Sequence, residues 1–136
     1  MSNKKYDIII HECSMPLDTN EIRENISENC SILIFDKTFY DIYHKRRYAP
    51  EMIFREYNIP KVFVRGHVPD GSYHPNVGLI EDISWIRKNC PEVYVIAFKS
   101  SSSKIKIDRH VHSFIIRGPG LEKELAAEII KGLVLV

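Results

Sequence analysis

Short runs of apolar, mostly β-branched residues recur along the chain and predict five strands. They span residues 6–10, 31–35, 61–64, 92–98 and 112–116. Within most of these runs the apolar residues are nearly continuous instead of alternating with polar ones. Such runs are typical of strands that are covered on both faces, as in a parallel sheet.

Segments in which apolar residues recur at helical spacing separate these runs. The expected helices span residues 19–29, 50–57, 76–89 and 121–131. Asp18 and Glu21 form a capping box at the start of the first helix, and Gly132 is expected to end the last one. The last helix is expected to bury Leu121, Leu125, Ala126, Ile129 and Ile130. Residues 39–48 are expected to form a turn or a short helix.

The alternation of strands and helices predicts an α/β fold with three layers, in which a mostly parallel sheet lies between helices. Right-handed crossovers through helices join consecutive parallel strands in such folds. The natural arrangement of five such strands is flavodoxin-like or Rossmann-like, with the strand order 2-1-3-4-5. The chain has 136 residues without a linker or an internal repeat, so we expect a single domain over residues 1–136.

Charge and cysteine content exclude several classes of protein. Nineteen Lys and Arg residues balance eighteen Asp and Glu residues, so no overall field favours nucleic acid or an anionic membrane. Cys13, Cys30 and Cys90 are far apart and form no C-x-x-C pair, which disfavours a disulfide framework and a zinc ribbon. No apolar run approaches the length of a membrane span or a signal-peptide core. We therefore expect a cytoplasmic protein.

Residues with chemically active side chains follow the predicted strands. In an open parallel sheet, ligands bind outside the carboxyl ends of the strands, where the strand order reverses. Here that point lies between the first and third strands. His11, Glu12 and Cys13 follow the first strand, and Arg65, His67, Asp70 and His74 follow the third. Ser100, Ser101 and Arg117 follow the last two strands at the same edge.

These residue types favour binding of an anionic small molecule, such as a nucleotide or a fragment of a cofactor. Arg65 and Arg117 can clamp an anion, and serine hydroxyls can donate hydrogen bonds to it. Cys13, Asp70 and His74 complete the predicted ligand-binding set, and His11, Glu12 and His67 are the candidates for catalysis. Whether the domain is an enzyme stays open, and the sequence assigns no cofactor.

Two other functions are compatible with the same residues. A non-catalytic assembly subunit would use residues 66–76 and the apolar C-terminus, Leu133 to Val136, to contact a protein partner or a second copy. A metal-dependent hydrolase would use His67, Asp70 and His74 as nitrogen and oxygen ligands. An enzyme or ligand binder should have a deep pocket beside His11 and Arg65, whereas an assembly subunit should expose an apolar patch elsewhere.

Phosphoryl acceptance can be tested against the sequence directly. A phosphoryl-accepting receiver domain has this architecture and needs paired acids after its first strand and an aspartate at the end of its third. In this sequence one acid, Glu12, follows the first strand, and Arg65 is at the end of the third strand where the aspartate is needed. We therefore expect a similar architecture without phosphoryl acceptance.

Overall fold

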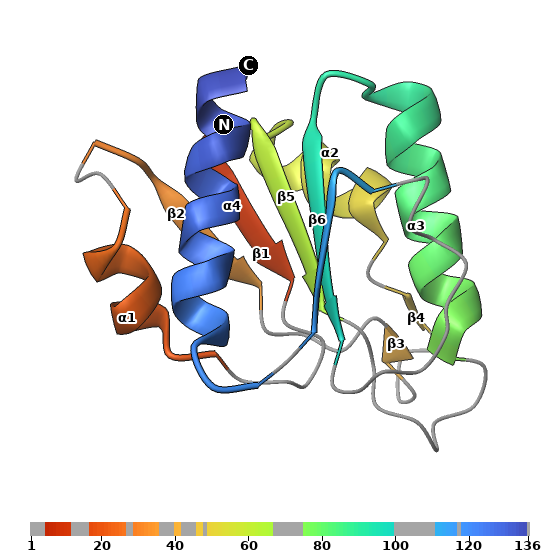
Figure 1. The fold of residues 1–136 in the computed structure, drawn as a ribbon. Helices are drawn as coiled ribbons and strands as arrows, with labels where there is room; N and C mark the ends of the chain where they lie inside the picture. The colour runs from red at the N-terminus through yellow and green to blue at the C-terminus, as the bar shows by residue number, and fades with distance from the viewer. Residues whose placement is uncertain are drawn as a thin grey trace.

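The computed structural model describes residues 5–11, 17–26, 29–35, 40–41, 46–47, 49–66, 75–99, 111–116 and 118–135. These residues form a sheet with helices packed on both of its faces (Figure 1). No helix within the described residues is long and apolar enough to cross a membrane.

The main sheet has the strand order β2-β1-β5-β6-β7, and all of its strands are parallel. Its strands are β1 (Ile8–His11), β2 (Ile32–Phe35), β5 (Val62–Gly66), β6 (Tyr94–Lys99) and β7 (Ser113–Ile116). The sheet confirms the flavodoxin-like α/β architecture expected from the continuous apolar runs. It also confirms that the first strand lies next to the third strand of this sheet, because β1 pairs with β5 in parallel.

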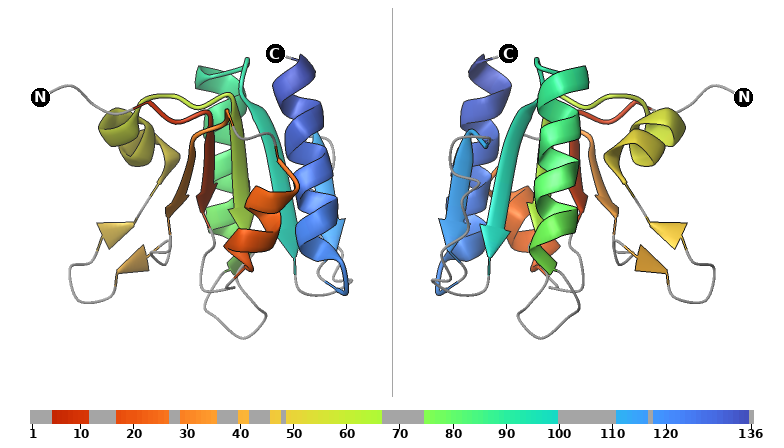
Figure 2. Two further views of the ribbon diagram at one scale, coloured as in Figure 1. Left: turned by 90° about the vertical axis from the view of Figure 1, so that its left-hand side faces the viewer. Right: turned by 90° about the vertical axis from the view of Figure 1, so that its right-hand side faces the viewer.

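Two pairs of helices cover the sheet, one pair on each face (Figure 2). Helices α1 (Thr19–Glu24) and α4 (Leu121–Leu135) pack together, as do α2 (Pro50–Tyr57) and α3 (Pro75–Asn89). Side chains of successive strand residues pack into two different cores, one on each face of the sheet. Ile8 and Ile10 pack in the core under α1 and α4, whereas Ile9 packs in the core under α2 and α3. This alternation explains why the strand sequences are apolar at consecutive positions.

Two boundaries differ from the expected ones. Asp18 caps α1 by accepting a hydrogen bond from the backbone N–H of Glu21 at 3.1 Å, as the capping box predicted, but the helix ends at Glu24 and not near residue 29. Residues 39–48 were expected to form a turn or a short helix, and the described residues of this range, 40–41 and 46–47, are not helical. Their described part is an antiparallel pair of short strands, β3 (Tyr40–Asp41) and β4 (Arg46–Arg47).

The end of α4 corrects a further expectation. Gly132 lies inside the helix and is buried, so it does not end the helix. A Cβ atom on Gly132 would lie 2.5 Å from Tyr94 Cδ1 and 3.0 Å from Val62 Cγ2. The glycine therefore allows α4 to approach the sheet closely. Leu121, Leu125, Ala126 and Ile129 are buried as predicted, but Ile130 is 39% exposed.

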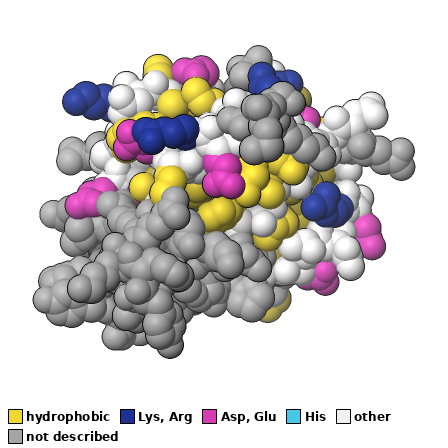
Figure 3. Space-filling view, turned by 180° about the vertical axis from the view of Figure 1, so that it is seen from behind, with side chains coloured by type: hydrophobic (Ala, Val, Ile, Leu, Met, Phe, Trp, Pro, Cys, Tyr) yellow, Lys and Arg dark blue, Asp and Glu magenta, His cyan; other side chains and the backbone are white. Residues whose placement is uncertain are grey.

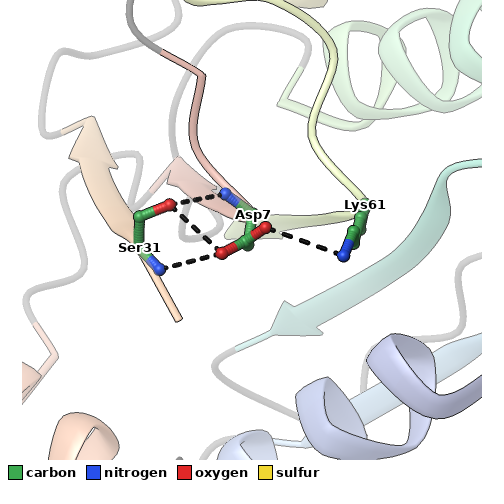
Figure 4. A network of polar contacts seen from close by, with 3 residues as sticks. All are labelled: Asp7, Ser31 and Lys61. Atoms are coloured by element: carbon green, nitrogen blue, oxygen red, sulfur yellow. Dashed lines mark hydrogen bonds and ion pairs between the residues drawn. The ribbon is translucent and has the colours of Figure 1, made fainter. Parts of the chain in front are cut away.

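The amino ends of three strands are joined by a polar network (Figure 4). The Asp7 carboxylate accepts hydrogen bonds from the backbone N–H of Ser31 at 3.0 Å and from its hydroxyl at 3.2 Å. The Ser31 hydroxyl oxygen accepts a hydrogen bond from the Asp7 N–H at 3.0 Å, and Lys61 Nζ lies 3.8 Å from Asp7 Oδ1. These contacts connect the starts of β1, β2 and β5, at the edge of the sheet opposite the predicted site.

Candidate functional site

The carboxyl ends of β1 and β5 form the described part of the predicted site. His11 is the last residue of β1, and its Cα atom is paired in register with that of Arg65. Both side chains are buried, with 0% of His11 and 1% of Arg65 exposed. The structure thus brings these two predicted residues together.

Arg65 lies within a strand and not in the loop where it was expected. Strand β5 continues to Gly66, one pairing step beyond Arg65. Because side chains alternate along a strand, Arg65 lies on the same face as Phe63, which packs in the core under α3. The expected loop position is therefore wrong, and the guanidinium points into the domain.

Asp82 of α3 is an ionic partner of Arg65 within the described residues. Arg65 Nε donates to Asp82 Oδ2 at 3.0 Å, and both side chains are 1% exposed. An Arg65 terminal nitrogen also donates to the backbone carbonyl of Gly66. A buried pair of this kind is costly to break, because removing one partner leaves an uncompensated charge away from water. The positive charge at the end of β5 is thus compensated inside the domain.

The buried position of Asp82 was not predicted from the sequence, although its place on an apolar helical face indicates it. It falls on the same helical face as Leu79, Ile83 and Ile86, which were expected to be buried. Ile83 and Ile86 are each 1% exposed in the structure. An acid in an apolar face is almost never fully buried without a partner, so it predicts a buried cation nearby.

His11 packs against an aromatic ring. Its imidazole meets the ring of Phe35 edge to face, with ring centroids 5.2 Å apart and an interplanar angle of 85°. Phe35 belongs to β2, and its Cα atom is paired in register with that of His11. The described surroundings of His11 are therefore those of a core residue at the boundary between β1 and β2.

Eight of the predicted site residues lie outside the described part of the chain. They are Glu12, Cys13, His67, Asp70, His74, Ser100, Ser101 and Arg117. Their catalytic, ligand-binding and metal-binding roles remain predictions. Of the other two cysteines, Cys90 is buried, and burial, with a smaller effect of Glu92, raises the pKa of its thiol. This thiol is therefore a poor nucleophile at neutral pH.

A second polar cluster, not predicted from the sequence, lies at the start of β6. The His112 ring stacks on Tyr94, with ring centroids 4.5 Å apart, and its Nδ1 accepts a hydrogen bond from the Val95 N–H at 3.0 Å. His112 Nε2 lies 3.1 Å from a terminal nitrogen of Arg87, and the Tyr94 hydroxyl donates to Glu128 at 3.3 Å. Burial and the nearby Arg87 charge both lower the pKa of His112. The cluster connects α3 and α4 around the edge of the sheet.

Apolar side chains gather on the face that carries α2 and α3. Figure 3 shows them across the middle of this face, with acidic and basic residues around them. Partly buried residues on this side include Tyr6, Leu33, Phe35 and Tyr57, and Ile59 is 43% exposed. The rings of Tyr6 and Tyr57 meet edge to face. This face therefore carries partly exposed apolar side chains among charged ones.

The comparisons with known proteins found no matching family model and no curated protein of significant similarity. Solved structures do match. A BeF3-activated receiver domain of DrrB has 15% identity and a TM-score of 0.60, over 96% of this chain and 98% of that one. The orphan response regulator HP1043 of H. pylori has 11% identity and a TM-score of 0.58, over 97% and 99% of the two chains.

The Mn²⁺-bound response regulator Rcp1 has 14% identity and a TM-score of 0.54, over 90% of this chain and 88% of that one. All of these identities are low, so the likeness concerns the fold and not the chemistry. The chain therefore has the flavodoxin-like fold of response-regulator receiver domains.

Proposed function

We propose that this domain is a receiver-like signalling module that acts through protein contacts and does not accept a phosphoryl group. One observation carries the proposal. Arg65 lies at the carboxyl end of β5, the third strand of the parallel sheet, where phosphoryl acceptance needs an aspartate. Its buried pairing with Asp82 makes this position part of the core.

The chemistry of the two side chains supports this proposal. An aspartyl phosphate forms when a carboxylate oxygen attacks phosphorus. A guanidinium stays protonated and only donates hydrogen bonds, so Arg65 cannot make that attack. Asp82 has a carboxylate, but it is 1% exposed and accepts a hydrogen bond from Arg65. Neither member of the pair is available as a nucleophile.

The apolar surface over α2 and α3 supports action through protein contact. Tyr6, Tyr57 and Ile59 contribute apolar area on the side of the molecule that carries these helices. Exposed apolar area among charged residues is typical of surfaces that bind other proteins. The proposed domain would thus keep the receiver architecture as a contact scaffold, with no chemical switch at β5.

Intact-mass spectrometry after incubation with acetyl phosphate and Mg²⁺ tests the proposal, with the DrrB receiver domain treated in parallel as the positive control. We expect this chain to keep its mass while the control gains one phosphoryl group. A stoichiometric gain on this chain that is labile in both acid and base would overturn the proposal, because an aspartyl phosphate is an acyl phosphate and hydrolyses in both.

The same protein can be used to test the anionic-ligand hypothesis. A ligand that binds only the native state raises the melting temperature by mass action. A rise with millimolar phosphate or ATP that is lost in Arg117→Ala would favour ligand binding at the edge of the sheet. We expect no such rise, because the Arg65 charge is already compensated by Asp82.

A further inference from the structure

A pocket at the amino edge of the sheet is separate from the candidate site described above. It has a volume of about 490 Å³ and is lined by Lys5, Phe54, Arg55, Asn58 and Ile59. Lys5 precedes β1, and the other four residues lie in the second half of α2 or follow it directly. Figure 2 shows the end of α2 beside the start of β1. The pocket therefore lies away from the carboxyl ends of the strands.

The apolar part of the lining has a fixed base and an exposed rim. Phe54 is 5% exposed and meets Phe63 edge to face, with ring centroids 5.4 Å apart. The core thus holds the Phe54 ring in place. Ile59 is 43% exposed, so much of its side chain remains in water. An apolar group that enters the pocket would cover this area, which favours binding through the hydrophobic effect.

The backbone of Asn58 is strained where it lines the pocket. Asn58 follows the last residue of α2 and has φ 67° and ψ 169°, a conformation that is essentially restricted to glycine. Directly after it, Ile59 is exposed and Pro60 is buried. Strained residues of this kind cluster at binding sites, where the surrounding structure holds them in place. The strained turn thus supports a binding role for this pocket.

The charged residues in the described lining are both basic. Lys5 and Arg55 are exposed, and a terminal nitrogen of Arg55 lies 3.3 Å from a carboxylate oxygen of Glu51. The side chains of this pair are 77% and 58% exposed, and exposed pairs of this type contribute little to stability. A carboxylate from a ligand can therefore replace Glu51 as the partner of Arg55. The pocket is complementary to an apolar group with negative charge beside it.

We propose that this pocket binds an acidic peptide segment of a partner protein. One large apolar side chain of the segment enters beside Phe54 and Ile59, and carboxylates on either side of it meet Lys5 and Arg55. The pocket is open and not enclosed, so the bound chain can continue past it in both directions. The inference rests on the proposed protein-contact role and names the chemistry of the partner.

An NMR titration of the labelled full chain tests the inference. The probe is a blocked pentapeptide with phenylalanine at its centre and two aspartates on each side. We expect saturable shifts of the backbone amides of Lys5 and of Arg55 to Ile59, with a Kd of about 1 mM or lower. One control peptide has glycine in place of phenylalanine, and another has lysines in place of the aspartates. Both should bind at least about tenfold more weakly.

Substitutions of exposed residues assign the contacts. Ile59→Ser and Arg55→Glu should each weaken binding of the probe by at least about fivefold. Ile130→Ser and Lys131→Glu are the matched controls, because these residues of α4 are also exposed but lie outside the pocket, and they should leave the Kd within about twofold. Glu51→Gln removes the competing carboxylate and should strengthen binding about twofold. The amide spectra also show whether each variant is folded.

Three results would overturn the inference. They are the absence of saturable shifts up to about 10 mM probe, equal binding of the glycine peptide, and tighter binding of an eight-residue thymidine oligonucleotide at the same amides, which would assign the pocket to nucleic acid. No phosphodonor is present in this titration. Phosphorylation in the mass assay would therefore refute the proposed function without changing these shifts, and a failed titration would leave the mass assay unaffected.

Discussion

Arg65 at the end of β5 and Asp82 in the middle of α3 form a buried ion pair, with 3.0 Å between Nε and Oδ2. The pair fixes the end of a central strand to the helix that covers it. In a receiver-like sheet this is the position at which phosphoryl acceptance needs a carboxylate. The pair therefore holds the end of β5 to α3 within the core, and under the proposed function it leaves no free carboxylate at this position for a phosphoryl group.

Removing one member of this pair should destabilise the domain strongly. Asp82→Asn leaves the Arg65 charge buried without its carboxylate, and we expect a loss of about 3–5 kcal/mol in the free energy of unfolding. The matched control is Glu51→Gln, which breaks the exposed ion pair with Arg55 and should cost less than about 1 kcal/mol. Urea denaturation measures both values.

Replacing both members together should restore much of the stability. The double variant Asp82→Leu with Arg65→Met removes both buried charges and supplies apolar volume, which is often neutral or stabilising at such sites. Equal destabilisation of the double and single variants would show that the pair has no special role in the core.

The Gly132 position should not tolerate a side chain. Alanine favours a helix over glycine by about 1 kcal/mol, but its Cβ would lie 2.5 Å from Tyr94 Cδ1. The Tyr94 ring cannot move freely, because it stacks on His112 and its hydroxyl donates to Glu128. We expect Gly132→Ala to lower stability by about 1–3 kcal/mol.

Thermal melts of Gly132→Ala, Tyr94→Leu and the double variant would assign the cause. If the clash with the ring dominates, Gly132→Ala should cost less in the Tyr94→Leu background than in the parent. Equal costs in the two backgrounds would contradict this explanation.

The His112 cluster predicts a loss of stability in acid. Burial and Arg87 lower the pKa of His112, so the folded state binds a proton less readily than the unfolded chain, whose histidine pKa is about 6.5. The stabilisation is therefore present above about pH 6.5 and is lost as the pH falls below that value. Protonation of Nδ1 also removes the acceptor of the Val95 N–H.

Urea denaturation at several pH values between 5 and 8 measures this effect as the difference between the parent and His112→Gln. The parent should lose stability relative to the variant as the pH falls. Arg87→Met removes the charge that faces the ring and should reduce the difference. A difference that is constant over this range would contradict the assignment.

Replacing two neighbouring residues near the end of α4 by alanine should have different effects on stability. Leu133 packs against the core under α1 and α4, whereas Val134 is 79% exposed. Leu133→Ala should cost about 1–2 kcal/mol and Val134→Ala less than about 0.5 kcal/mol. Chemical denaturation of the two variants measures this, and equal costs would mean that Leu133 does not contribute to the core.

The elements of the fold could be predicted because they depend on local patterns. Continuous apolar runs such as residues 6–10 indicate strands covered on both faces, and Asp18 marks the start of a helix. The failures came from contacts between distant segments. Gly132 resembles a helix stop locally, and only the nearby Tyr94 ring shows why it lies inside the helix.

The candidate site was predicted less well for the same reason. The sequence correctly placed His11 and Arg65 at the carboxyl ends of two neighbouring strands, because the reversal of strand order follows from the α/β pattern. It wrongly placed Arg65 in a loop, since a charged residue after an apolar run usually marks the end of a strand. Here the strand continues because Asp82, seventeen residues further along, neutralises the charge within the core.

Beryllofluoride binding tests the central claim most directly, because it is an equilibrium measurement and does not depend on a slow phosphoryl transfer. DrrB has been solved as a BeF3-activated receiver domain, so the same reagent with Mg²⁺ serves as the probe and DrrB as the control. NMR spectra of the labelled chain would follow the Arg65 Nε–H and the backbone amides of β5. We predict that these resonances do not move while the control shows saturable shifts. Saturable shifts of the β5 resonances in this chain would contradict the account.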